Sequence, residues 1–249
     1  MQRYFIIFSY DGAAYHGWQI QPNAPTVQQK LEEALATLLR VAIPLVGAGR
    51  TDSGVNAARM VAHADLPDGC DVAQLKYKLN RILPFDIAVS DIRAVRSGAH
   101  ARFDAISRRY SYYVTTLKSP FARRYSCRVP ADLDFEAMNR AASTLMEYTD
   151  FTSFSKLHTD VKTNNCKVVY AEWRRLNDSC WVFEIEADRF LRNMVRAIVG
   201  TLLLVGRHKM TIDEFRSVIE KRERCAAGDS AVAEALFLSD VVYPNDIYL

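Results

Sequence analysis

The sequence predicts an α+β fold of two lobes, and three observations support this. Segments of strand character recur along the 249 residues, and amphipathic segments with helical period lie between them. The strands come in hairpin-like pairs rather than in strict strand–helix–strand units. The pattern then starts again after "SGAHARFDA". We therefore expect one lobe at residues 1–104 and a second at 105–249, with the seam near residues 98–108.

The elements of the first lobe follow from local patterns. Residues 2–10 read as a strand, and a long loop follows them. Thr26 is a suitable N-cap for the helix "VQQKLEEALATLLR", which places Leu31, Leu35 and Leu38 on one face. The remaining elements expected here are strands at 41–48, 59–65 and 86–95 and a helix at 72–82.

The second lobe repeats the mixture of strands and helices. A hairpin is expected from "KVVYAEWRRL" and "CWVFEIEA", which turn around Asn177 and Asp178. The other elements expected are a strand at 109–116, a helix at 134–146, a long helix from Phe190, a shorter helix from Ile212 and a last strand near 236–243.

Composition places the chain in an ordinary class. Hydrophobic content of 49% and charged content of 24% are typical of soluble globular proteins. The longest apolar run, at residues 197–205, is about half of the roughly 20 residues that a membrane span needs. The five cysteines contain no C-x-x-C pair, and the histidines show no metal-ligand spacing. We therefore expect a cytoplasmic protein without a metal or a disulfide framework.

Arginine dominates the basic residues. The net charge is only +3, but most of the 32 basic residues are arginines, whose forked guanidinium suits phosphate and base contacts. A helix from Phe190 would hold Arg189, Arg192 and Arg196 within a sector of about 60°. A solvated surface with scattered ion pairs would produce the same pattern. The arginine clusters lie at 108–109, at 123–124 with 128, at 174–175, and at 189, 192 and 196.

One short turn concentrates the features of a catalytic acid. The segment "GRTDSGVN", residues 49–56, contains Asp52 as its only carboxylate, with Arg50 two residues earlier. Gly49 and Gly54 flank the acid and permit a tight turn that a ligand can approach closely. The alternative is structural, because Asp and Ser commonly bond their own backbone in turns.

Several motifs in order resemble one family. Together they resemble the tRNA pseudouridine synthase A family over nearly the whole chain. The motifs are "YDGAAYHGWQIQ" followed by "TVQQKLEEAL", "GRTDSGVNA", "LPFDIAV", "HARFDAISRRYSYYV", "DFTSF" and "FLRNMVRAIVGTLLLVG".

The resemblance implies a cofactor-free isomerase that converts uridine to pseudouridine in tRNA. Members of the family act in the anticodon stem-loop, at tRNA positions 38, 39 and 40, and work as homodimers. The implied fold is two α+β lobes with a shared extended, mostly antiparallel mixed sheet and a basic cleft between them. We therefore expect tRNA as the partner, with no membrane and no metal.

The resemblance also assigns roles to residues. Asp52 matches the essential acid and becomes the candidate nucleophile, which attacks either carbon 6 of uracil or carbon 1′ of ribose. Arg196 matches the basic residue that pairs with this acid. Tyr110 matches the aromatic residue that packs on the target base.

Four further residues are assigned to substrate binding. Arg50 would hold the flipped-out nucleotide or fill its place. Arg102 and Asp104 would position RNA, or alternatively tie the lobes together. Arg192 belongs to the arginine face expected on the helix from Phe190.

Two positions in the acid turn depart from the family pattern. Ser53 replaces the usual Ala, a small change that one hydrogen bond can accommodate. Asn56 replaces the usual His, which removes a charge change near neutral pH.

Two other classes of function stay open at this point. One is an RNA-binding protein without chemistry, against which the set of Asp52, Tyr110 and Arg196 argues. The other is a hydrolase of a glycosidic bond, or one of aspartic-protease type. "TDSG" resembles a D-T-G turn, but the residue order differs and a second such turn is missing.

Overall fold

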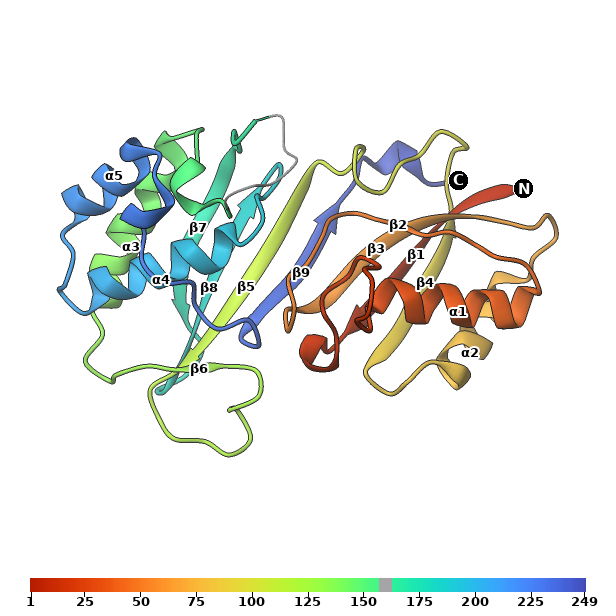
Figure 1. Cartoon of the computed structure of the whole chain (residues 1–249), viewed down its shortest axis with the longest axis horizontal. Helices are drawn as coiled ribbons and strands as arrows, with labels where there is room; N and C mark the ends of the chain where they lie inside the picture. Colours follow the sequence, from red (N-terminus) through yellow and green to blue (C-terminus); the bar gives the residue numbers. More distant parts are fainter. Residues whose placement is uncertain (157–162) are drawn as a thin grey trace. The chain divides into compact units, whose positions relative to one another are not determined.

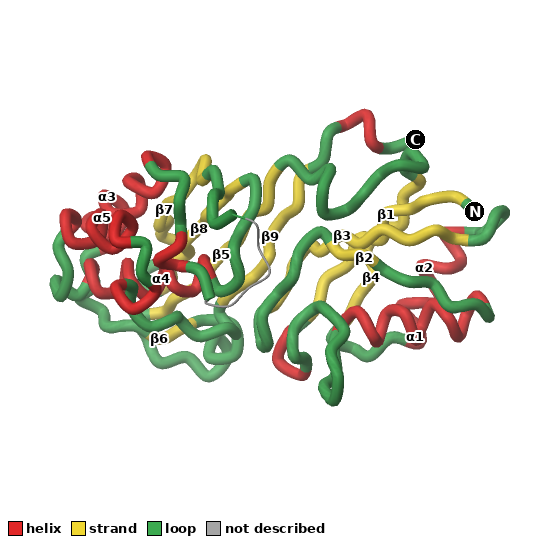
Figure 2. The backbone as a smooth tube through the Cα atoms, turned by 45° about the horizontal axis from the view of Figure 1, so that its top comes forward, coloured by secondary structure: helices red, strands yellow, loops and turns green. Residues whose placement is uncertain are grey.

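The computed structural model describes residues 1–156 and 163–249 (Figures 1 and 2). In this part of the chain, nine strands form a mixed, mostly antiparallel sheet, accompanied by five α-helices. The expected α+β class is confirmed. Within the same residues, no helix combines the length and the hydrophobicity that crossing a membrane requires.

The chain forms two compact units. Unit 1 comprises residues Met1–Ile106 and Leu238–Leu249, and unit 2 comprises Ser107–Phe237. The sequence-based division at 104 and 105 assigned the C-terminal residues to the second lobe. In the structure, residues Leu238–Leu249 are grouped with unit 1. They include most of strand β9 (Leu236–Val242), which is the neighbour of β3 (Asn56–Leu66).

Unit 1 is built around strand β1 (Gln2–Tyr10). This strand pairs antiparallel with β3 on one side and with β4 (Ile87–Ala94) on the other. Helices α1 (Val27–Leu39) and α2 (Val72–Ile82) pack against each other, and α2 also packs against β4. The expected cap is confirmed, because the Thr26 side chain accepts a hydrogen bond from the Gln29 amide. Leu31 and Leu35, on one face of α1, are fully buried.

The strand expected at residues 41–48 is mostly wrong. Only β2 (Val46–Gly47) pairs, antiparallel to β3. The reason lies in the helix beside it: Glu32 accepts a hydrogen bond from the Leu45 amide at 2.8 Å, and Gln28 donates one to the Leu45 carbonyl at 3.0 Å. These side chains occupy the backbone groups that a strand partner would need, and Pro44 has no amide hydrogen to offer.

Unit 2 has a second antiparallel sheet region with helices against it. Strand β8 (Cys180–Ala187) pairs antiparallel with β5 (Ser107–Thr115) and with β7 (Val168–Arg175), which confirms the hairpin around Asn177 and Asp178. Strand β6 (Cys127–Arg128) runs parallel to β5. The helices are α3 (Phe135–Ser143), α4 (Met194–Gly206) and α5 (Ile212–Lys221).

Short 3₁₀ segments complete both units. The helix expected at 134–146 ends earlier, at Ser143, and continues as a 3₁₀ turn. The 3₁₀ segments are Gly12–Ala14, Thr144–Glu147, Thr152–Phe154, Arg224–Ala226 and Asn245–Ile247.

The helix expected from Phe190 begins four residues later, at Met194. Asn193 has a left-handed φ of 67°, and the carbonyl of Arg192 accepts a hydrogen bond from the Lys156 amide at 3.1 Å. A left-handed residue interrupts right-handed helical geometry, so Arg192 lies in a turn before the helix. The predicted single helical face with Arg189, Arg192 and Arg196 is therefore wrong.

Candidate active site

Asp52 lies in the turn that connects β2 to β3. The Val55 amide donates a hydrogen bond to the Asp52 carbonyl at 3.2 Å, which closes the turn. Gly54 adopts a φ of 78°, as a tight turn at this position requires. The Asp52 side chain is half-buried, whereas Arg50 is exposed. The turn therefore presents a carboxylate at the surface of unit 1 on a short, closed segment of backbone.

The loop after β1 holds this turn from both sides of Asp52. The Tyr10 hydroxyl lies 2.8 Å from the Thr51 hydroxyl, and these two groups share a hydrogen bond. The carbonyl of Tyr15 accepts hydrogen bonds from the Gly54 amide and from the Ser53 hydroxyl, both at 3.3 Å. The single hydrogen bond expected for Ser53 is thus present. The neighbours of Asp52 on each side are tied to β1 or its following loop.

Two glycines of the same loop allow backbone to pack on backbone. Gly17 has a φ of +89°, and a Cβ there would lie 2.2 Å from the Thr51 carbonyl oxygen. A Cβ at Gly12 would lie equally close, 2.2 Å, to the Val55 carbonyl oxygen. Side chains at these positions would push against the residues that bracket Asp52. By contrast, a Cβ at Gly49 meets no atom within 4 Å.

The loop is itself anchored. The Tyr15 hydroxyl donates a hydrogen bond to the Asp86 carboxylate at 2.7 Å, and burial together with this bond raises the pKa of Tyr15. Gly17 and Trp18 accept hydrogen bonds from the first amides of the α1 region at 3.3 and 3.0 Å. Because the phenol stays neutral and bonded, the turn rests on a fixed support.

Asn56 has a structural task in this support. It is 1% exposed, and its side-chain oxygen accepts a hydrogen bond from the Gly12 amide at 2.8 Å. The departure from the family's usual His at this position therefore falls on a buried residue that fastens the loop to β3.

Arg102 and Asp104 lie in a turn near the end of the first segment of unit 1, Met1–Ile106. The Asp104 carboxylate accepts a hydrogen bond from the His100 amide at 2.8 Å and lies 3.9 Å from the Arg96 guanidinium. The exposed Arg102 guanidinium lies over the ring of Phe103 at 5.7 Å. Asp104 therefore shapes the turn that displays Arg102.

A buried histidine supports the same turn and had no signal in the sequence. His63 is 7% exposed, and its Nδ1 accepts a hydrogen bond from the Ala101 amide at 3.1 Å. Burial, and next the charges of His100 and Arg3, lower the pKa of His63 to about 4. The imidazole is neutral at pH 7 and acts as an acceptor.

Tyr110 lies in the middle of β5, opposite Ile185 of β8. It is 9% exposed, and its ring meets that of Phe190 edge to face, with centroids 5.1 Å apart at 86°. This packing fixes the plane of the phenol ring within unit 2.

Arg196 lies in the first turn of α4 and is bound to the segment before β9. Its Nε donates a hydrogen bond to the Ala231 carbonyl at 2.7 Å, and the Ala231 amide donates one back to the Arg196 carbonyl at 2.9 Å. Next to this pair, the Ser230 hydroxyl is bonded to Asn193 at 2.7 Å and to Arg224 at 3.0 Å. The guanidinium is therefore oriented through one of its nitrogens.

The close approach of this segment to α4 depends on a glycine. A Cβ at Gly200 would lie 1.7 Å from the Asp229 carbonyl oxygen. In the sequence, the glycine in "RAIVG" indicates a close approach of another segment to this helix, but it does not indicate which segment approaches.

The structure distributes the predicted site residues over the two units. Unit 1 carries a set that lies on the Asp52 turn and on the His100 turn: Arg50, Asp52, Arg102 and Asp104. Unit 2 carries Tyr110, Arg192 and Arg196. The pairing of Arg196 with Asp52 joins residues of different units and stays a prediction. Among the described residues, no group of three or more His, Cys, Asp or Glu side chains could hold a metal ion.

Comparison with known proteins identifies related sequences of one family. A family model described as tRNA pseudouridine synthase matches residues 141–244. The chain is 60% identical to the tRNA pseudouridine synthase A of Bacteroides thetaiotaomicron over 250 residues, covering 100% of this chain and 93% of that protein. It is 58% identical to the Bacteroides fragilis protein of the same name, covering 100% of this chain and 99% of that protein.

A more distant relative agrees. The tRNA pseudouridine synthase A of Bacillus subtilis is 41% identical over 241 residues, covering 95% of this chain and 97% of that protein. Identity of this extent over whole chains, together with the glycine-supported acid turn, shows that the chain belongs to the tRNA pseudouridine synthase A family.

Proposed function

We propose that the protein isomerises uridine to pseudouridine in the anticodon stem-loop of tRNA, at positions 38, 39 and 40. The observation that carries this proposal is the fixed turn of Asp52. Residues on both sides of the acid are bonded to β1 or its following loop, and two glycines admit the close packing. A rigid support of this kind suits a group that must meet a reacting atom within a few tenths of an ångström.

The proposed chemistry is balanced without a cofactor. The bond between ribose C1′ and uracil N1 breaks, the uracil rotates, and a bond between C1′ and C5 forms. C5 loses a proton and N1 gains one, so the mass of the RNA is unchanged. Asp52 acts as the nucleophile in its ionised form and attacks either uracil C6 or ribose C1′.

Arg196 supplies the cation that accompanies this carboxylate in the proposed mechanism. An adjacent guanidinium favours the charged form of an acid. Support comes from its fixed orientation, since the Nε–Ala231 hydrogen bond holds the side chain at the start of α4. In this proposal the lobe of residues 1–104 carries the nucleophile, and that of residues 105–249 carries Arg196 and Tyr110.

The remaining residues would bind the RNA. Tyr110 would pack on the target base, for which its fixed ring plane is suited; such stacking is worth about 1–3 kcal/mol. Arg50 would hold or replace the flipped nucleotide, and its exposed position directly before the acid turn supports this role. Arg102, Asp104 and Arg192 would position the RNA chain.

The protein would act in the cytoplasm as a homodimer. A stable dimer should bury well over about 1,000 Å². Light scattering at working concentration should give twice the chain mass of 28.3 kDa, and a monomeric mass would refute this part.

Unmodified tRNA transcripts provide the test of the reaction. After incubation with the purified protein, pseudouridine is mapped by chemical labelling, and the RNA mass and free uracil are measured. We expect pseudouridine in the anticodon arm with unchanged RNA mass. Release of uracil or an abasic site would establish hydrolysis instead. Binding without any modification would leave an RNA-binding protein without chemistry.

A further inference from the structure

The connection between β5 and β6 is strongly basic. Residues 116–131 contain no Asp or Glu, but they contain four basic residues: Lys118, Arg123, Arg124 and Arg128. Figure 1 shows this connection leaving the strands of unit 2 as a wide loop near β6. We call residues 117–128 the basic loop.

Three of these cations are available to a ligand. Lys118, Arg123 and Arg128 are exposed, and within the described residues none of them makes an ion pair. Other arginines of unit 2 have acidic partners: Arg109 lies 2.6 Å from Glu186, and Arg216 lies 2.6 Å from Glu147. Within the described residues, the positive charges of Lys118, Arg123 and Arg128 are therefore not neutralised by ion pairs.

The basic loop has a defined shape. The Ala122 amide donates a hydrogen bond to Ser119 at 3.2 Å, and Ser126 donates one to the Ala122 carbonyl at 2.8 Å. Tyr125 packs on Phe237 with ring centroids 5.9 Å apart. Phe121 is 91% exposed, although burying a Phe side chain is ordinarily favourable by about 1.5–3 kcal/mol.

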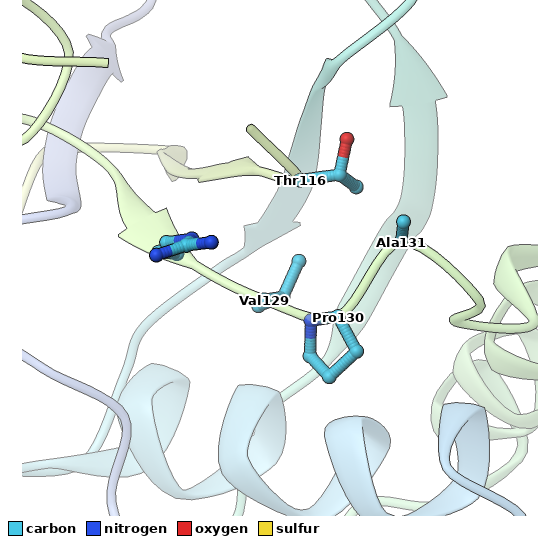
Figure 3. Close-up of a pocket in the computed structure, with 5 residues that line it drawn as sticks. Thr116, Val129, Pro130 and Ala131 are labelled. Atoms are coloured by element: carbon cyan, nitrogen blue, oxygen red, sulfur yellow. The ribbon is translucent and has the colours of Figure 1, made fainter. Parts of the chain in front are cut away.

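An open hollow lies at the base of the loop. It has a volume of about 450 Å³ and is lined by Thr116, Arg128, Val129, Pro130 and Ala131 (Figure 3). Arg128 belongs to β6, where it is paired with Thr115, so its backbone is held by the sheet. The hollow offers space for a polar group beside Arg128, whose backbone is fixed.

We propose that the basic loop and the hollow at its base bind the sugar-phosphate backbone of the RNA substrate, away from the reacting nucleotide. This inference rests on the proposed function. Thr115, beside Arg128, lies five residues beyond Tyr110 on β5, which corresponds to about 17 Å along the strand. Phosphate contacts at such a distance fix the register of an RNA without reading its sequence.

The chemistry of the loop favours RNA over a protein partner. Exposed arginines suit phosphate oxygens, to which they donate paired hydrogen bonds. An exposed aromatic ring such as that of Phe121 can pack on a base or ribose. Protein interfaces are depleted in lysine, so Lys118 favours RNA over a protein partner, whereas arginine and aromatic residues occur in both kinds of interface.

The test compares two double variants that each remove two positive charges. Arg123→Gln with Arg128→Gln alters the basic loop. Arg81→Gln with Arg207→Gln is the matched control, since both of its arginines are exposed and lie outside the loop and the proposed active site. The affinity for an unmodified tRNA transcript is measured by fluorescence anisotropy over a range of salt concentrations.

The basic-loop variant should bind about tenfold more weakly at 0.15 M salt. The slope of log affinity against log salt should fall by about 1.4–1.8, because two phosphate contacts are lost. The control should keep the wild-type slope. Equal slopes for the basic-loop variant and wild type would overturn the proposal, as would equal losses in both double variants.

Further measurements distinguish RNA binding by the loop from a folding defect and from a protein interface. Thermal unfolding shows whether Arg128→Gln disturbs β6. If it does, the double variant Lys118→Gln with Arg123→Gln replaces it, because these two residues lie in the loop and outside β6. The same change in the salt slope is expected for this variant. A change in the mass by light scattering with an unchanged slope would assign the loop to a protein interface and overturn the proposal. If wild type forms no pseudouridine and the slope still falls, the proposed function fails and the RNA-binding loop stands.

Discussion

An alanine at position 17 should displace the Thr51 carbonyl and, through it, the catalytic candidate Asp52. The added Cβ would lie 2.2 Å from the Thr51 oxygen, whereas ordinary contacts begin near 3.4 Å. Relief of this overlap requires a shift of about 1 Å in one of the two backbones. A misplacement of about 1 Å at a reacting group can reduce the rate about 100-fold.

The cost in stability has two parts. Gly17 has a φ of +89°, and a left-handed conformation costs an alanine about 1–2 kcal/mol. Overpacking against a fixed backbone costs about 1–3 kcal/mol. We therefore expect Gly17→Ala to lower the free energy of unfolding by about 2–5 kcal/mol, with the lower values if the turn yields.

The assay combines urea unfolding with single-turnover pseudouridine formation on a tRNA transcript. Gly49→Ala is the control, because its Cβ meets no atom within 4 Å and its backbone needs no left-handed φ. The control should change the free energy of unfolding by less than about 0.5 kcal/mol. A folded Gly17→Ala protein with wild-type stability and rate would refute the idea that this loop positions Asp52.

Three further predictions concern the supports of the site. Arg196→Ala should lower the rate of pseudouridine formation about 100-fold while changing tRNA affinity little, whereas equal losses in rate and affinity would make Arg196 a phosphate contact. Ser230→Ala removes the hydrogen-bond partner of Asn193 and Arg224 and should lower the rate of pseudouridine formation about fivefold. Ser230→Thr should restore the rate. An unchanged rate in Ser230→Ala would show that this hydroxyl does not help to position Arg196. The lowered pKa of His63, about 4, means that the unfolded chain binds a proton below pH 6.5 while the folded chain does not. Stability should therefore fall by about 3 kcal/mol between pH 6.5 and 4, and His63→Gln should lose correspondingly less in the same denaturant titration; parallel pH profiles would contradict this.

Local patterns predicted the elements whose signals are contained in their own residues. The strand at 2–10, the helix after Thr26 and the helix at 72–82 all appear within a residue of the expected bounds. Each combines a regular apolar period with a cap or turn residue at its end. The predicted strand at 41–48 failed because distant side chains, Glu32 and Gln28, bind the backbone of Leu45.

The start of α4 shows a second limit of periodic patterns. The residues from Phe190 to Asn193 fit a helical period, but the amide of Lys156 bonds the Arg192 carbonyl, and Asn193 is left-handed. A contact between segments distant in sequence overrides the local preference. The expected arginine face was lost for this reason, although Arg196 itself remains on the helix.

The acid turn was apparent in the sequence, but its support was not. Asp52 stood out because glycines and a strand end surround it. The roles of Gly12, Gly17 and Asn56 depend on two backbones meeting across about 40 residues of chain. A single sequence contains no signal that these two segments come into contact, so the residues that support the Asp52 turn were found only in the structure.

The central claim is that the Asp52 carboxylate performs the chemistry and is not needed merely to bind RNA. Asp52→Asn keeps the size and the backbone of the side chain and removes its charge. Binding of a tRNA transcript and single-turnover pseudouridine formation are measured with the same protein preparation. We predict affinity close to that of wild type and a rate reduced at least about 10⁴-fold. A variant that forms pseudouridine within about tenfold of the wild-type rate would contradict the claim.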